Sequence, residues 1–226
     1  KSTYNRNEIP FAASTDTAGN IWIAGIIQTG GTVDFNGNVT LASALWKVDM
    51  SPFPGVLSQP TTIYHGAGLE VFGDVRLDAF DQPWVIGYSL NPVLNKLDLV
   101  LSHYDPDGAT LLSSTTLAGF AAVNFDNINA SLALSPSAIY AAATRTAPNG
   151  KANLAFVKYD LAGSTQVIKS WSNSIFGGDD IPSRVILDAN GNVLIAGRFG
   201  DTGSVSHLAL WTYGPAGNLI SAQTVS

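Results

Sequence analysis

Four copies of one sequence unit occupy this chain, and this repetition constrains the fold more than any single residue does. Each copy has a polar marker residue, a short turn and then an apolar segment. In the clearest copy, Asp188 precedes a turn at residues 189–191 and an apolar segment at residues 192–197. The equivalent markers of the earlier copies are Asp16, Asp78 and Ser135, so successive markers lie 62, 57 and 53 residues apart.

The two ends of the chain together complete one more period. Counted from Asp188 through the C-terminus and on from Lys1 to Asp16, the remaining distance is 54 residues. An open solenoid gives no reason for this match, and its ends normally carry atypical capping repeats. The spacing therefore predicts a closed ring in which residues 1–8 lie beside the last strand.

Hydrophobic and polar residues alternate within each unit, which is typical of half-buried β-strands. In the last unit we expect strands at residues 184–188, 192–198, 207–213 and 219–225, separated by short turns such as Asn190-Gly191. Four meandering strands per unit, repeated radially, form the blade of a β-propeller. The sequence predicts an all-β, four-bladed β-propeller with four antiparallel strands per blade. It would be a single domain with blades near residues 8–66, 67–120, 121–178 and 179–226.

The segment from Leu187 to Gly197, followed by an apolar strand that ends in Tyr-x-x-x-Gly, resembles the blade repeat of secreted bacterial β-propeller repeat proteins. The third copy departs from this pattern, because Ser135-Pro136-Ser137-Ala138 replaces its Asp-x-x-Gly turn. The resemblance implies a secreted or cell-envelope location. It also implies a binding or interaction module more often than an enzyme.

Composition narrows the classes of partner. The formal net charge is −6, which argues against nucleic acid and anionic lipid because both require a basic face. No apolar run reaches the roughly 18 residues of a membrane-spanning helix. The chain has no cysteine, which excludes a disulfide framework and a thiol nucleophile. Protein or glycan surfaces remain as partners, and the oligomeric state stays open.

Groups that could catalyse a reaction are few and dispersed. His65, His103 and His207 fall in different predicted strands of three blades, and no hydrolase or phosphate-binding motif occurs. We therefore expect the protein not to be an enzyme.

Tryptophan positions follow the repeat. Trp22, Trp84 and Tyr140 occupy equivalent places in the second strands of three blades, which favours packing between blades over sugar stacking. Trp171 lies in an outer strand of polar sequence. It is the tryptophan that we expect to contact a ligand.

One set of oxygen-bearing side chains recurs eight residues before each marker: Glu8, Glu70, Asn127 and Asp180. Two interpretations are open. Each side chain could cap a tight turn between blades. Alternatively, the four could converge at one mouth of the central channel and bind Ca²⁺ or Na⁺, because carboxylate and amide oxygens are hard donors. No cofactor is otherwise required.

The sequence as a whole favours a non-catalytic extracellular or envelope binding module on a β-propeller scaffold. Three alternatives remain. The first is a lectin-like carbohydrate binder. The second is a glycan hydrolase or lyase that uses the channel-mouth carboxylates as acid and base. The third is one segment of a larger repeat protein or filament.

Overall fold

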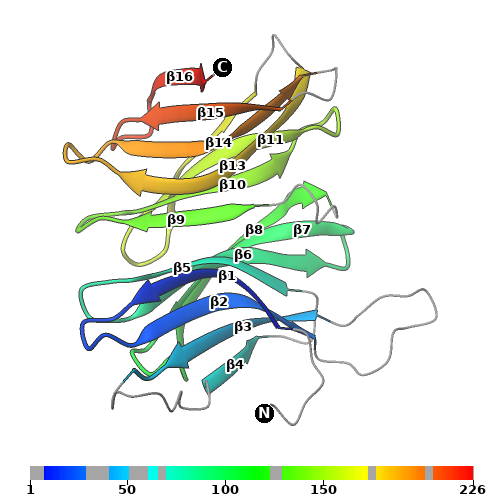
Figure 1. The fold of residues 1–226 in the computed structure, drawn as a ribbon. Helices are drawn as coiled ribbons and strands as arrows, with labels where there is room; N and C mark the ends of the chain where they lie inside the picture. The colour runs from blue at the N-terminus through cyan, green and yellow to red at the C-terminus, as the bar shows by residue number, and fades with distance from the viewer. Residues whose placement is uncertain are drawn as a thin grey trace.

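A computed structural model describes residues 8–28, 41–50, 61–65, 70–122, 129–172, 177–201 and 206–225. These residues form sixteen strands in four antiparallel sheets (Figure 1). Blade one contains β1 (Glu8–Thr15), β2 (Ile21–Gln28), β3 (Leu41–Val48) and β4 (Thr61–His65). Blade two contains β5 (Glu70–Leu77), β6 (Pro83–Asn91), β7 (Lys96–Tyr104) and β8 (Leu111–Ala122). Blade three contains β9 (Ala130–Leu134), β10 (Ile139–Thr146), β11 (Ala152–Tyr159) and β12 (Thr165–Trp171). Blade four contains β13 (Gly177–Leu187), β14 (Val193–Asp201), β15 (Ser206–Tyr213) and β16 (Leu219–Val225). The all-β fold of four four-stranded blades is therefore confirmed.

The first strand of each blade is its inner strand. Contacts between inner strands run in order, from β1 to β5, from β5 to β9 and from β9 to β13. In Figure 1 blade one lies at the bottom and blade four at the top, with blades two and three between them. Among the described strands, β1 and β13 do not share a contact as extensive as those that join the other inner strands.

The predicted ring closure requires residues 1–8 to lie beside the last strand. Residues 1–7 lie outside the described part of the chain, so the closing contact stays a prediction. The described strands give it no support. Inner strands of neighbouring blades pack together from blade one to blade four, but β13 and β1 do not share a comparable contact.

The repeat markers begin equivalent hairpin turns between the first and second strands. The backbone N–H of Asp188 donates to the carbonyl of Asn192 (2.9 Å), and one side-chain oxygen of Asp188 accepts from the N–H groups of Asn190 and Asn192. In blade three the Ser135 hydroxyl oxygen accepts from the N–H of Ala138 (2.9 Å). A shorter hydroxyl-capped turn thus replaces the aspartate-capped one, which explains how the degraded copy still forms a hairpin.

Three of the four inner strands carry a β-bulge, whose extra residue is Phe11, Gly73 or Ser183. Opposite each bulge the second strand has a glycine: Gly25, Gly87 and Gly197. Blade three has Ala143 at this place, and β9 pairs with β10 without interruption. A bulge turns the inner backbone over the facing residue, so that only glycine fits there.

Large side chains fill the spaces between blades, as the repeat positions of the aromatics predict. Trp22, Trp84 and Tyr140 are buried, with exposed fractions of 0%, 2% and 3%, and Trp211 is buried as well. Figure 1 shows the stacked sheets between which these side chains pack. The predicted core-packing role of these aromatics is confirmed.

Candidate functional site

A cavity of about 340 Å³ lies where the inner strands of the four blades come together. Every blade contributes to its wall: Phe11 from blade one, Asp74 from blade two, Ser131 from blade three and Arg184 from blade four. Small-molecule sites commonly enclose roughly 300–1,000 Å³. We call this space the central cavity.

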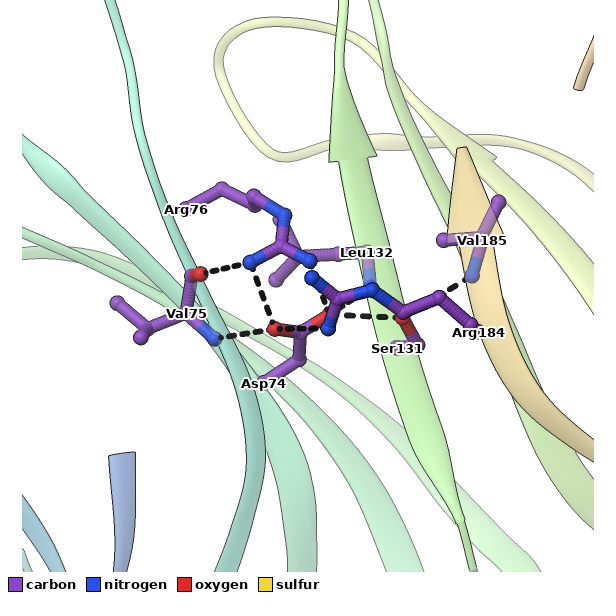
Figure 2. Close-up of polar contacts among 7 residues, drawn as sticks. All are labelled: Asp74, Val75, Arg76, Ser131, Leu132, Arg184 and Val185. Atoms are coloured by element: carbon purple, nitrogen blue, oxygen red, sulfur yellow. Dashed lines mark hydrogen bonds and ion pairs between the residues drawn. The ribbon is translucent and has the colours of Figure 1, made fainter. Parts of the chain in front are cut away.

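Asp74 lies at the centre of a polar network that joins three blades (Figure 2). Its carboxylate is buried and accepts from the Ser131 hydroxyl (2.7 Å) and the Leu132 N–H (3.0 Å), both in blade three. Within its own strand it accepts from the Val75 N–H (2.9 Å) and forms an ion pair with Arg76 (3.0 Å). A buried carboxylate requires such partners, because an uncompensated charge away from water is costly.

Blade four completes the network. Arg184 Nη1 lies 3.4 Å from both carboxylate oxygens of Asp74, and the Val185 N–H donates to the Ser131 hydroxyl oxygen (3.2 Å). The inner strands β5, β9 and β13 are therefore linked through side chains as well as through apolar packing. Figure 2 shows the side chains of Arg76 and Arg184 both directed toward the Asp74 carboxylate.

The two arginines of this network have different environments. The Arg76 side chain is 18% exposed, and burial lowers its pKa from the ordinary value, while the charge of Asp74 opposes that change. The repulsive charge of Arg184 lowers the pKa of Arg76 further. The Arg184 side chain is 49% exposed, so its guanidinium is shared between Asp74 and the cavity.

Aromatic residues form another part of the cavity wall. Phe11 lines the cavity as an exposed bulge residue of β1, with 49% of its surface accessible. Tyr88 shares its single hydroxyl proton between the carbonyls of Asn129 (3.1 Å) and Thr144 (2.8 Å), and burial raises its pKa. These bonds fix the backbone where blades two and three meet. The cavity therefore has an aromatic surface, a cationic side chain and nearby polar groups on a rigid frame.

The residues predicted for a cation site do not meet in this cavity. Glu70 is directed between blades one and two, where it accepts from the Ser43 hydroxyl of β3 (2.9 Å). Asp180 has no exposed surface, so it does not line an open channel mouth. Asn127 lies outside the described residues, and of Glu8 only the backbone is described. Among the described side chains, no group of three or more metal ligands comes together.

A constant sequence offset from the markers does not correspond to a constant place in the blades. Glu70 and Asp180 do occupy equivalent register positions, two residues before the residue that pairs with the bulge-facing glycine of the second strand. Blade three lacks the extra bulge residue, so the same count from Ser135 does not reach the equivalent position. The described contacts of Glu70 and the burial of Asp180 give the expected convergence no support. The convergence and a bound Ca²⁺ or Na⁺ stay predictions.

Trp171 is half-buried at the end of β12. Its ring lies edge-on against Trp211 of blade four, with centroids 5.3 Å apart. This contact makes Trp171 part of the packing between blades three and four. Ligand contact by its remaining exposed surface stays a prediction.

A second hollow of about 550 Å³ lies at the turn ends of blades two and three. Its wall includes Phe80 and His103, and the His103 ring stacks on Trp84 with centroids 3.9 Å apart. Burial lowers the pKa of His103, and the charge of Asp78 opposes that change. His103 Nε2 lies 3.5 Å from Asp78 Oδ2, so Asp78 raises the pKa of His103 less than burial lowers it.

This environment predicts how stability responds to acid. Because the folded-state pKa of His103 lies below its unfolded value of about 6.5, the unfolded state binds the proton more tightly. The contribution of His103 to stability is therefore full above that value and declines as pH falls below it. We expect His103→Gln to lose less unfolding free energy than the wild type between pH 7.5 and 5.5, measured by urea denaturation. A wild-type loss equal to that of the variant would contradict this.

No model of a known protein family matches the chain. A search of curated protein sequences finds no match either. Among the described residues, no helix is long and apolar enough to cross a bilayer.

Solved structures do share the fold. An α-L-arabinanase from Penicillium chrysogenum, complexed with arabinobiose, superposes with a TM-score of 0.64 at 11% identity, over 96% of this chain and 65% of the enzyme. A β-1,2-mannobiose phosphorylase from Listeria innocua gives a TM-score of 0.55 at 8% identity, over 100% of this chain and 78% of that one. An α-L-arabinofuranosidase from Lactobacillus brevis gives 0.51 at 11% identity, over 92% and 73%. This chain thus spans less than two thirds of the arabinanase, and these likenesses support the propeller fold.

The expectation that the protein is not an enzyme has to be corrected. Several structures that share its fold are enzymes, including the arabinanase, the phosphorylase and the arabinofuranosidase. At 8–11% identity this is a weak pointer, because fold does not determine activity. The shared fold therefore does not argue against catalysis.

Proposed function

We propose that this protein binds carbohydrate in the central cavity. One observation carries the proposal: a cavity of about 340 Å³ joins an exposed aromatic ring, Phe11, to an exposed guanidinium, Arg184. Sugars present both an apolar face of C–H groups and a rim of hydroxyls. An aromatic surface beside hydrogen-bonding groups is therefore a suitable receptor for them.

The parts of the cavity have complementary tasks in this proposal. Phe11 stacks against the apolar face of the sugar ring. Arg184 donates to ring hydroxyls, and Ser183 and Asn129 supply further polar groups on the cavity wall. Asp74 holds Arg184 in place, since its carboxylate is already engaged by blades two and three.

Support comes also from the proteins that share the fold. The arabinanase was observed with arabinobiose, and the phosphorylase with β-1,2-mannobiose. The identities of 8–11% carry the fold alone, so no specific sugar is transferred to this chain. The resemblance of the blade repeat to secreted proteins makes the cell exterior or envelope the place where we expect binding to occur.

Glycan cleavage is the second function to test. Cleavage by an acid and a base requires two carboxyl groups about 5–9.5 Å apart. Within the described lining of the central cavity, Asp74 is the carboxylate that meets the ligand space, and its oxygens are occupied by five donor groups. A binding screen should therefore be read together with the release of reducing sugar from each ligand that binds.

Phe11→Ala tests the proposed function. We expect it to weaken sugar binding about tenfold, because the stacking surface is lost. Half of the Phe11 surface is exposed, so the loss of stability should be small. A glycan array identifies the ligand, and isothermal titration calorimetry compares its affinity for the two proteins.

Phe80→Ala is the matched control, since Phe80 is 76% exposed and lies at the separate hollow between blades two and three. We expect this variant to bind as the wild type does. The proposal fails if no glycan on the array binds, or if both phenylalanine variants bind as tightly as the wild type.

A further inference from the structure

The charges of the network beside the central cavity are not balanced. One carboxylate, Asp74, faces two guanidinium groups, Arg76 and Arg184. These three side chains together carry a net charge of +1, within a chain whose formal net charge is −6. A local positive charge at a cavity wall attracts anions and repels cations.

Asp74 is shared unequally between the two arginines. Arg76 lies closer, with 3.0 Å between Nη1 and Oδ1, and it is the more buried of the two side chains. Arg184 Nη1 lies 3.4 Å from each oxygen, a distance at which hydrogen bonds are weak. The closer pair therefore satisfies most of the Asp74 charge, and the charge of Arg184 is the one left uncompensated.

Arg184 also has donors to spare. A guanidinium carries five N–H groups in a planar fork, and the described contacts of Arg184 with Asp74 use Nη1 alone. Nearly half of the Arg184 side chain is exposed, and the residue lines the cavity. Its remaining donors suit a planar carboxylate, which a guanidinium binds through two parallel hydrogen bonds.

We propose that the saccharide bound in the central cavity is acidic, with a ring carboxylate, as in a uronic acid, paired to Arg184. This inference rests on the proposed function and specifies the class of sugar. Phe11 would contact the apolar face of the ring while Arg184 binds the carboxylate. Asp74 would keep the guanidinium oriented and would not itself contact the carboxylate.

A purely structural role is the competing interpretation of Arg184. Blades three and four are also joined there by the Val185 N–H, which donates to Ser131, and Ser131 donates to Asp74 (2.7 Å). These bonds do not pass through Arg184. Its long contacts and exposed surface therefore leave it available for a ligand.

The test compares sugars that differ only in the acidic group. Isothermal titration calorimetry is performed with glucuronic acid against glucose and with galacturonic acid against galactose. We expect at least one acidic sugar to bind about tenfold or more tightly than its neutral partner, because hydrogen bonds between charged groups are the stronger ones. The preference should shrink at high salt, as partly exposed charges are screened.

Arg184→Gln should abolish the preference, because it should weaken binding of the acidic sugar more than binding of its neutral partner. Arg184→Lys, which keeps the charge but lacks the fork, should retain part of the preference. Arg198→Gln is the control, because Arg198 lies exposed on β14 and does not line the cavity. Thermal unfolding shows that each variant is folded, and Arg184→Lys still tests the inference if Arg184→Gln is not.

Equal binding of acidic and neutral sugars by the wild type would overturn this inference and leave the proposed function standing. A preference that survives Arg184→Gln would overturn the role of Arg184. If neither kind of sugar binds, this inference fails, and the glycan array decides whether the proposed function fails with it.

Discussion

Asp74→Ala is expected to lower the free energy of unfolding by about 3–5 kcal/mol, since removing one partner of a buried ion pair leaves the other charge uncompensated. Arg76 would keep its charge in a largely buried position without a counter-ion. The Ser131 hydroxyl and the Leu132 N–H would lose their acceptor at the same time. Urea denaturation monitored by tryptophan fluorescence measures the loss.

Asp188→Ala supplies the control for this prediction. Asp188 also accepts several hydrogen bonds, from Asn190 and Asn192, but it does so in a hairpin turn and without a cationic partner among its described contacts. We expect a clearly smaller loss of stability. An equal loss in the two variants would show that Asp74 acts only as a local turn or strand cap and not as a link between blades.

The Asp74 effect should also depend on its partner. In a double-mutant cycle, Asp74→Ala and Ser131→Ala are expected to be less destabilising together than the sum of their separate effects, because they remove the same hydrogen bond. Additive losses would indicate that the bond between β5 and β9 contributes nothing to stability.

The fold could be predicted from the sequence because its signal is local and repeated. Marker residues such as Asp188 form their turn with the next four residues, and the alternation in β14 and β15 reports which face of the sheet is buried. Neither signal depends on residues far away in the chain. Four repetitions of the same signal then determine the blade and the number of blades.

The candidate site could not be predicted in this way. A constant distance from the markers selects four oxygen-bearing side chains, of which Glu70 bonds to Ser43 and Asp180 is buried. Three residues of the network occupy one register position in blades two, three and four: Asp74, Ser131 and Arg184 all pair with the residue before the bulge-facing position of the second strand. Equivalent positions of these blades carry unlike residues, and an acid, a hydroxyl and a base at those positions can bond to one another.

The bulges explain why counting failed. A bulge adds one residue to β5 and β13 but not to β9, so equal sequence distances do not mean equal places in the sheet. Gly87 and Gly197 in the second strands are the sequence sign of the bulge, and Ala143 in the third blade is the sign of its absence. Aligning the copies on this position would have brought Asp74, Ser131 and Arg184 into register.

This relation between glycine and bulge gives the second large effect. Gly87→Ala would place a Cβ 2.9 Å from Phe72 Cα and in still closer contact with the carbonyl oxygen of Val71. Both obstacles are backbone atoms of β5, which cannot move aside as a side chain can. We expect a loss of about 3 kcal/mol in the free energy of unfolding, at the upper end for added groups in a packed core.

The reverse change in blade three is the matched control for Gly87→Ala. Ala143 is fully buried opposite the regular strand β9, where a Cβ fits. Ala143→Gly should cost only about 1 kcal/mol, through backbone freedom and the lost methyl contact. If Gly87→Ala were as mild as Ala143→Gly under the same urea denaturation, the bulge in β5 would not require glycine. The bulge places Asp74 in register with Ser131 and Arg184, so Gly87→Ala should also weaken saccharide binding where Ala143→Gly does not.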